Sequence, residues 1–153
     1  MITLPATAGH GLALGRVMTD LTVQRFMTKS PHTIGHDQSL AMAHHMMTDH
    51  AIRHLPVLEG GKLVGVLSDR DLNYVQALGG VDASQVKVSE AMSAEVFTVT
   101  PSTSISQVSA QMADHKYGSA VVVEGEKVVG VFTTVDALRA LTSLLEGMGI
   151  KKH

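Results

Sequence analysis

The stretch LPVLEGGKLVGVLSDRD, Leu55 to Asp71, recurs later in the chain as AVVVEGEKVVGVFTTVD, Ala120 to Asp136. The offset of 65 positions holds back to Val23 and Val88, and 15 of the 50 positions Val23–Leu72 are identical in the second copy. Roughly three identities would be expected by chance. Two copies of one supersecondary unit therefore make up most of the chain. We expect them to pack into one pseudo-two-fold domain with two related clefts between the copies.

Composition narrows the possible functions. The 153 residues are 44% hydrophobic, which suffices for one core. Cysteine is absent, which excludes disulfides and thiolate chemistry and agrees with a cytoplasmic location. A net charge of −2 and the absence of tryptophan argue against a nucleic-acid partner. No apolar run reaches the roughly 18 residues of a membrane span, and no signal peptide is apparent, so we expect no membrane partner.

The sequence pattern of each copy predicts a mixed α/β (α+β) unit with the element order β-α-β-β-α. In the first copy we expect strands at 33–34, 55–58 and 63–67, a helix from Ser39 to about His50, and a second helix after Ser68. In the second copy we expect strands at 98–99, 120–123 and 128–132, and helices at 105–114 and 134–146. The glycine-containing turns at 59–61 and 124–126 join the paired strands.

The predicted organisation has five parts. These are an N-terminal segment at 1–21, partly flexible, a first repeat at 22–78, a linker at 79–86, a second repeat at 87–146 and a C-terminal tail at 147–153. Periodicity before the first repeat is weak, although Arg16–Phe26 is compatible with a helix.

A hydroxyl and a carboxylate three residues apart stand at the same strand-to-helix junction of both copies. The pairs are Ser68 with Asp71 and Thr133 with Asp136. A helix start offers amide groups to a phosphate, and a carboxylate can accept both hydroxyls of a ribose. The same spacing also nearly matches a capping box, which simply starts a helix. Repetition after a G-V-(L/F) strand favours a binding site.

Three motifs resemble the cystathionine β-synthase (CBS) domain, and two such domains in tandem resemble a Bateman module. They are M-(T/S) followed by (H/F)-T-(I/V), then R-H-L-P-V, then G-K-L-V-G-V-L-S-D-R-D, and the likeness covers about Thr22 to Leu144. The resemblance implies two β-α-β-β-α repeats that bind AMP, ADP, ATP or S-adenosylmethionine in their clefts. Such pairs sense a ligand rather than catalyse, and often form a disc-like dimer.

The resemblance also assigns residues to the first nucleotide-binding site. Asp71 matches the ribose carboxylate, Ser68 the hydroxyl beside it, and Arg70 a phosphate contact. Arg53 and His54 match a pair that reaches phosphate. The residues matching the adenine wall are Thr33, Ile52 and Pro56.

The second site keeps the ribose features in Asp136 and Thr133, but it loses the cations. Arg53, His54 and Arg70 are replaced there by Gly118, Ser119 and Val135. The residues in the adenine-wall positions are Thr98, Tyr117 and Val121. We therefore expect unequal clefts, with phosphate bound at the first and with Arg139 partly compensating at the second.

The histidines do not predict a metal site. His44 and His45 are adjacent, so a helix turns them about 100° apart, which hinders a shared ion. His50 and His115 occupy equivalent positions near helix ends, where a hydrogen-bond donor suits the helix dipole. We expect no bound metal and no obligatory cofactor.

The leading functional hypothesis is a regulatory adenine-nucleotide sensor that acts on a partner protein and forms a homodimer. The dimer would bury an apolar helix face that includes Leu138, Leu141, Leu144 and Leu145. The first alternative is a structural or interaction module with vestigial clefts, and the second is a metal-responsive protein that uses its histidines. An enzyme is not expected, because no nucleophile or base stands in a convincing setting.

Overall fold

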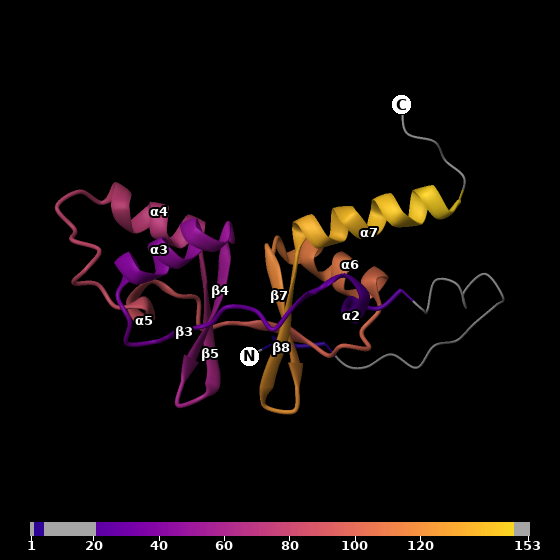
Figure 1. Cartoon of the computed structure of the whole chain (residues 1–153), viewed down its shortest axis with the longest axis horizontal. Helices are drawn as coiled ribbons and strands as arrows, with labels where there is room; N and C mark the ends of the chain where they lie inside the picture. Colours follow the sequence, from indigo (N-terminus) through magenta and orange to yellow (C-terminus); the bar gives the residue numbers. More distant parts are fainter. Residues whose placement is uncertain (1, 5–20, 149–153) are drawn as a thin grey trace. The chain divides into compact units, whose positions relative to one another are not determined.

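The computed structural model describes residues 2–4 and 21–148 (Figure 1). The described chain forms two compact units. Unit 1 consists of Ser30–Val96 with Gly125–Val128, and unit 2 consists of the described parts of Ile2–Lys29, Phe97–Glu124 and the chain from Val129. The C-terminal tail beyond Met148 and most of the predicted N-terminal segment lie outside the described residues, as does the part of the predicted helix at 16–20.

Unit 1 is a three-stranded sheet with helices. Its elements are β3 (Ile34–Gly35), α3 (Leu40–His50), β4 (His54–Glu59), β5 (Lys62–Ser68), α4 (Asp69–Ala77) and α5 (Val88–Ala91). The strand order is β3-β4-β5, with β3 parallel and β5 antiparallel to β4. Figure 1 shows α3 and α4 side by side against the β4–β5 hairpin. Alternate residues of the hairpin, Leu55, Val57 and Leu67, enter the core beneath these helices, as the period of a strand requires.

Unit 2 repeats this plan with two additional edge strands. Its elements are β1 (Ile2–Thr3), α2 (Val23–Phe26), β2 (Thr28–Lys29), β6 (Phe97–Val99), α6 (Ile105–His115), β7 (Ser119–Glu124), β8 (Lys127–Thr133) and α7 (Thr134–Gly147). The strand order is β1-β6-β7-β8-β2. The mixed α/β fold class and the element order predicted for each copy are confirmed, with boundaries that differ by one or two residues.

Matching caps define the first long helix of each unit. The Ser39 hydroxyl accepts from the Met42 N–H at the start of α3, and the Ser104 hydroxyl accepts from the Gln107 N–H at the start of α6, both at 3.1 Å. Both helices end on a left-handed residue, Ala51 at φ 51° and Lys116 at φ 58°. The backbone path that leads from each helix into the following strand is therefore the same in the two units.

Each unit is completed by a short segment from the start of the other sequence copy. The Val23 N–H of α2 donates to the Thr103 carbonyl oxygen of unit 2 at 2.9 Å, and the Val88 N–H of α5 donates to the Gln38 carbonyl oxygen of unit 1 at 2.8 Å. The sequence copies and the folded units are thus related by an exchange of these segments.

Two glycines make room for the exchanged segments. A Cβ atom on Gly65 would collide with the Met92 sulfur, and one on Gly130 would collide with the Met27 sulfur. Gly65 and Gly130 are equivalent in the two copies, as are Met27 and Met92. The same close approach therefore anchors the exchanged segment in each unit.

Candidate functional site

The two strand-to-helix junctions are built alike. Asp71 Oδ2 accepts from the Ser68 N–H at 2.8 Å and from the Ser68 hydroxyl at 2.9 Å, while the Ser68 hydroxyl oxygen accepts from the Asp71 N–H at 3.2 Å. Thr133 and Asp136 repeat this geometry at the start of α7. Each pair is therefore a complete capping box.

The two capping carboxylates differ in what their second oxygen meets. The Asp71 cap uses only Oδ2, so Oδ1 takes no part in it. In the second copy, Oδ1 of Asp136 lies 3.9 Å from the Arg139 guanidinium, and the Asp136 side chain is only 5% exposed. The first junction can thus offer a carboxylate oxygen to a ribose more readily than the second. Arg139, which was expected to compensate partly for the missing cations of the second site, forms this ion pair with Asp136.

Arg53 lies beside the start of α4. The Asp69 N–H donates to the Arg53 carbonyl oxygen at 2.9 Å, and the Arg53 Nε lies 3.9 Å from Asp69 Oδ2. The Arg53 side chain is 78% exposed, so this ion pair is weak and leaves the guanidinium able to turn toward an anion. In the second copy, the Thr134 N–H donates to the Gly118 carbonyl oxygen at 3.2 Å. Gly118 has no side chain that could contact a ligand.

His54 is half-buried at the start of β4. Burial lowers the pKa of His54 below its usual 6.5, an effect that Asp69 and Asp71 partly oppose. The lowered pKa favours the neutral imidazole, which can donate or accept a hydrogen bond.

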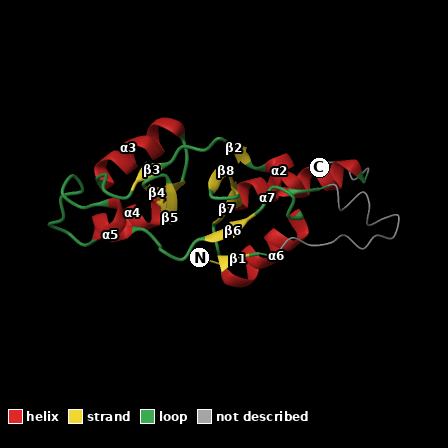
Figure 2. Cartoon of the chain, turned by 90° about the horizontal axis from the view of Figure 1, so that it is seen from below, coloured by secondary structure: helices red, strands yellow, loops and turns green. Residues whose placement is uncertain are grey.

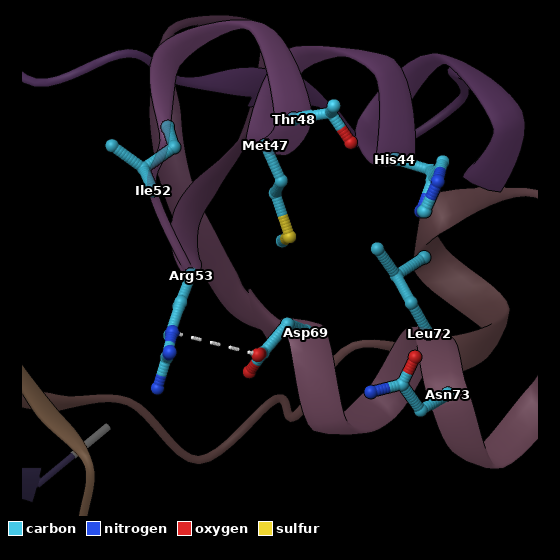
Figure 3. Close-up of a pocket in the computed structure, with 8 residues that line it drawn as sticks. All are labelled: His44, Met47, Thr48, Ile52, Arg53, Asp69, Leu72 and Asn73. Atoms are coloured by element: carbon cyan, nitrogen blue, oxygen red, sulfur yellow. Dashed lines mark ion pairs between the residues drawn. The ribbon is translucent and has the colours of Figure 1, made fainter.

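A cavity of about 240 Å³ lies between α3 and α4 of unit 1. In Figure 3 the Met47 side chain points into its middle, and Arg53 and Asp69 face each other across one end. The residues that line the cavity are His44, Met47, Thr48, Ile52, Arg53, Asp69, Leu72 and Asn73. Only Ile52 and Arg53 belong to the site predicted from the sequence.

Helix geometry explains why the other predicted residues do not line this cavity. Asp69, Leu72 and Asn73 share one face of α4, whereas Arg70 and Asp71 are turned from Asp69 by about 100° and 200°. Residues 44, 47 and 48 are spaced to share one face of a helix, and so are residues 69, 72 and 73. These spacings could have indicated a groove between the two helices, but they were not used in the prediction.

The remaining first-site residues lie on or near the sheet. His54 and Pro56 share the face of β4 opposite Leu55 and Val57, which enter the core. Pro56 is buried, Thr33 is half-buried just before β3, and Arg70 is exposed on α4. The structure thus divides the predicted first site between the sheet face, the capped junction and the α3–α4 cavity.

The second set of predicted residues is more deeply covered. Thr98 and Val121 are 0% and 1% exposed. The Tyr117 ring packs against Phe97 and stacks on His115, with ring centroids 5.2 and 5.1 Å apart. Gly118 is exposed and Ser119 half-buried at the start of β7. In this part of unit 2 the side chains are packed against one another, whereas the equivalent part of unit 1 carries polar groups.

The histidines are used in separate local contacts. His32 stacks on His50 with ring centroids 3.7 Å apart, and His115 Nδ1 lies 3.0 Å from the Gln111 carbonyl oxygen near the end of α6. Within residues 2–4 and 21–148, no three histidine, aspartate or glutamate side chains come together in a way that could hold a metal ion. In the same part of the chain, no helix is both long enough and apolar enough to cross a membrane.

Comparison with known proteins places these features in a family. The CBS domain model matches residues 23–77 and 88–143. The chain is 32% identical over 115 residues to the CBS domain-containing protein YhcV of Bacillus subtilis, covering 75% of this chain and 81% of that protein.

Solved structures share the fold. A putative acetoin utilization protein (AcuB) from Vibrio cholerae superposes with a TM-score of 0.74 at 30% identity, covering 87% of this chain and 98% of that one. The CBS domain pair of protein MJ0100, crystallised with 5′-methylthioadenosine and S-adenosyl-L-methionine, gives a TM-score of 0.72 at 25% identity, covering 80% and 97%. With both repeats matched by the family model and the same fold in these relatives, the chain belongs to the CBS domain family and carries two CBS domains in tandem.

Proposed function

We propose that this chain is a regulatory sensor of adenosine-containing ligands, AMP, ADP, ATP or S-adenosylmethionine, that passes its state to a partner protein. The observation that carries the proposal is the first junction, where Asp71 caps the first turn of α4 and keeps Oδ1 outside the cap. A carboxylate oxygen beside a helix start can accept from a ribose hydroxyl. The related MJ0100 pair, which holds two adenosine compounds, supports this class of ligand.

The first site is the proposed phosphate site. Arg70 and Arg53 are exposed close to the start of α4, a helix of nine residues whose first amide groups add positive potential. The second copy has Val135 and Gly118 at these positions. A ligand with less negative charge, such as S-adenosylmethionine, is therefore favoured at the second site.

The sensor is proposed to work as a homodimer. Apolar side chains at a helical spacing remain exposed along α7 and at the residue that follows it, namely Val135, Leu138, Leu141, Leu145 and Met148. A stripe of this kind indicates a contact surface, and a second copy of the chain would bring an identical stripe to it.

Titration calorimetry with AMP on the wild type and on Arg70→Ala tests the proposal. A well-formed charge-assisted bond contributes about 1.5–3 kcal/mol, so Arg70→Ala should weaken AMP by about tenfold or more. Lys62→Ala is the matched control, because Lys62 is exposed at the opposite end of β5 and its loss should leave the affinity unchanged.

Other results would favour the alternatives. Absence of saturable binding of AMP, ATP and S-adenosylmethionine would indicate a structural module with vestigial clefts. Stabilisation by zinc or nickel in a thermal-shift assay, without any response to these nucleotides, would indicate a metal-responsive protein.

A further inference from the structure

The strand β1 extends the sheet of unit 2 beside the second predicted site. It runs parallel to β6, with Ile2 opposite Phe97 and Thr3 opposite Thr98, and it forms one edge of the sheet (Figure 2). The Leu4 N–H donates to the Thr98 carbonyl oxygen at 3.1 Å, and the Leu4 side chain packs against the core of unit 2. Residues 2–4 are thus attached to the sheet by both backbone and side chain.

The Thr98 side chain is hydrogen-bonded to this strand. Its hydroxyl donates to the Ile2 carbonyl oxygen at 3.2 Å and lies 3.0 Å from the Thr3 hydroxyl. A hydroxyl has a single proton to donate, and here that proton is used. Thr98 is 0% exposed, so no ligand can touch it while β1 is in place.

The equivalent residue of unit 1 is in a different situation. Thr33 precedes β3, which is an edge strand of its three-stranded sheet, and its side chain is half-buried. The two sheets therefore differ at the same position, since an additional strand covers the threonine in unit 2 and none does so in the described part of unit 1.

We propose that β1 is an intramolecular blocker of the second adenosine site, a role that rests on the function proposed above. A ligand that uses Thr98 must first displace residues 2–4. Its apparent affinity is then reduced by the fraction of molecules in which β1 is released. The blocker is a strand of two residues, and short edge segments of this kind open more readily than the core of a domain.

The first consequence is that loosening β1 should expose a second site. Leu4→Asp places a charge where Leu4 packs against the core, so it should release the strand. Ile2→Asp is the matched control, because it adds the same charge to the same segment, residues 2–4, at a side chain that is 41% exposed.

Calorimetric titration with adenosine would measure binding at the second site. Adenosine is suitable because it carries the base and the ribose without a phosphate. In the wild type, binding should be confined to the first site. In Leu4→Asp a second binding event should appear, or its affinity should rise by about tenfold or more. Ile2→Asp should resemble the wild type.

A second variant protects the test against misfolding. Thr3→Val removes the hydroxyl that meets Thr98 and adds no charge, so it should strengthen second-site binding less than Leu4→Asp does, with an unchanged circular dichroism spectrum. If adenosine binds the first site while neither Leu4→Asp nor Thr3→Val alters the second, β1 is not a blocker and the sensor function stands. If adenosine, AMP and S-adenosylmethionine bind none of the proteins, the sensor function itself is wrong.

Discussion

Asp71 is the residue at which the sequence pattern presented capping and ribose binding as alternatives, and we propose that it performs both. Its Oδ2 completes the cap of α4, and Oδ1 is outside the cap. The reciprocal bonds with Ser68 show that the structural role exists, and they leave room for a ligand contact by the same carboxylate. A substitution at this position should therefore affect both stability and binding.

We expect Asp71→Ala to lower the free energy of unfolding by about 1 kcal/mol and to abolish nucleotide binding. Chemical denaturation and calorimetry with AMP would measure the two effects. Ser39→Ala is the control, because it removes the cap of α3 at a comparable cost and leaves the Asp71 carboxylate in place. Unchanged AMP affinity in Asp71→Ala would mean that the carboxylate serves only as a cap.

His54 should make stability depend on pH. Because burial lowers its pKa in the folded chain, the unfolded chain takes up a proton below pH 6.5 more readily than the folded chain does. The contribution of the neutral imidazole is complete above pH 6.5 and is lost as the pH falls toward the lowered pKa. The free energy of unfolding should therefore decrease below pH 6.5.

Denaturation of the wild type and of His54→Gln between about pH 5 and pH 8 would check this dependence. The wild type should lose more stability on acidification than the variant, since glutamine has no proton to gain. Parallel pH curves would show that His54 contributes nothing to the acid sensitivity of the fold.

At the scale of the elements, local sequence patterns predicted the hairpins and the long helices. The β4–β5 and β7–β8 hairpins follow from alternating apolar residues around glycine turns, and both long helices of unit 1 follow from their serine caps. The four-residue helices α2 and α5 carry too little sequence to show a period. Their partners are fixed by distant backbone bonds, such as that from Val23 to Thr103, which no local pattern reveals.

The parts of the candidate site that depend on local sequence were likewise predictable. Repetition of the hydroxyl–carboxylate pair identified both junctions. The covering of Thr98 was not predictable, because it depends on a contact with Thr3 across 95 positions of sequence. The expectation of a partly flexible N-terminal segment did not anticipate that Ile2–Thr3 would form a strand.

The exchanged segments provide a test at this scale. We expect Gly65→Ala to lower the free energy of unfolding by about 1–3 kcal/mol, because a Cβ atom there meets the Met92 sulfur and lies 2.9 Å from the Ser93 carbonyl oxygen. Thermal or chemical denaturation would measure the loss. Gly147→Ala, with open space around the added carbon, should be neutral or slightly stabilising.

A double variant separates the two collisions. Met92→Ala added to Gly65→Ala should restore only part of the stability, since the Ser93 backbone oxygen stays in place. A fully tolerated Gly65→Ala would show that the exchanged segment is not held by this close approach.

At the scale of the whole molecule, the exposed stripe on α7 makes association the main expectation. Light scattering at micromolar concentration should give twice the chain mass of 16.2 kDa. Leu138→Glu should shift the mass toward one chain without unfolding the protein, because Leu138 is 63% exposed. A wild-type mass near 16.2 kDa would contradict the dimer.

The exchange of segments has a consequence for synthesis on the ribosome. Nearly all of unit 1 is the continuous stretch Ser30–Val96, so most of it is available to fold once Val96 has emerged. Strand β1 must wait for β6, and β2 for β8, whose partner residue for Thr28 is Val131. At about 5–20 residues per second, this delay lasts on the order of 5–20 s. Strands β1 and β2 are thus made well before their partners, and until β6 and β8 have emerged their own edges stay open to other strands.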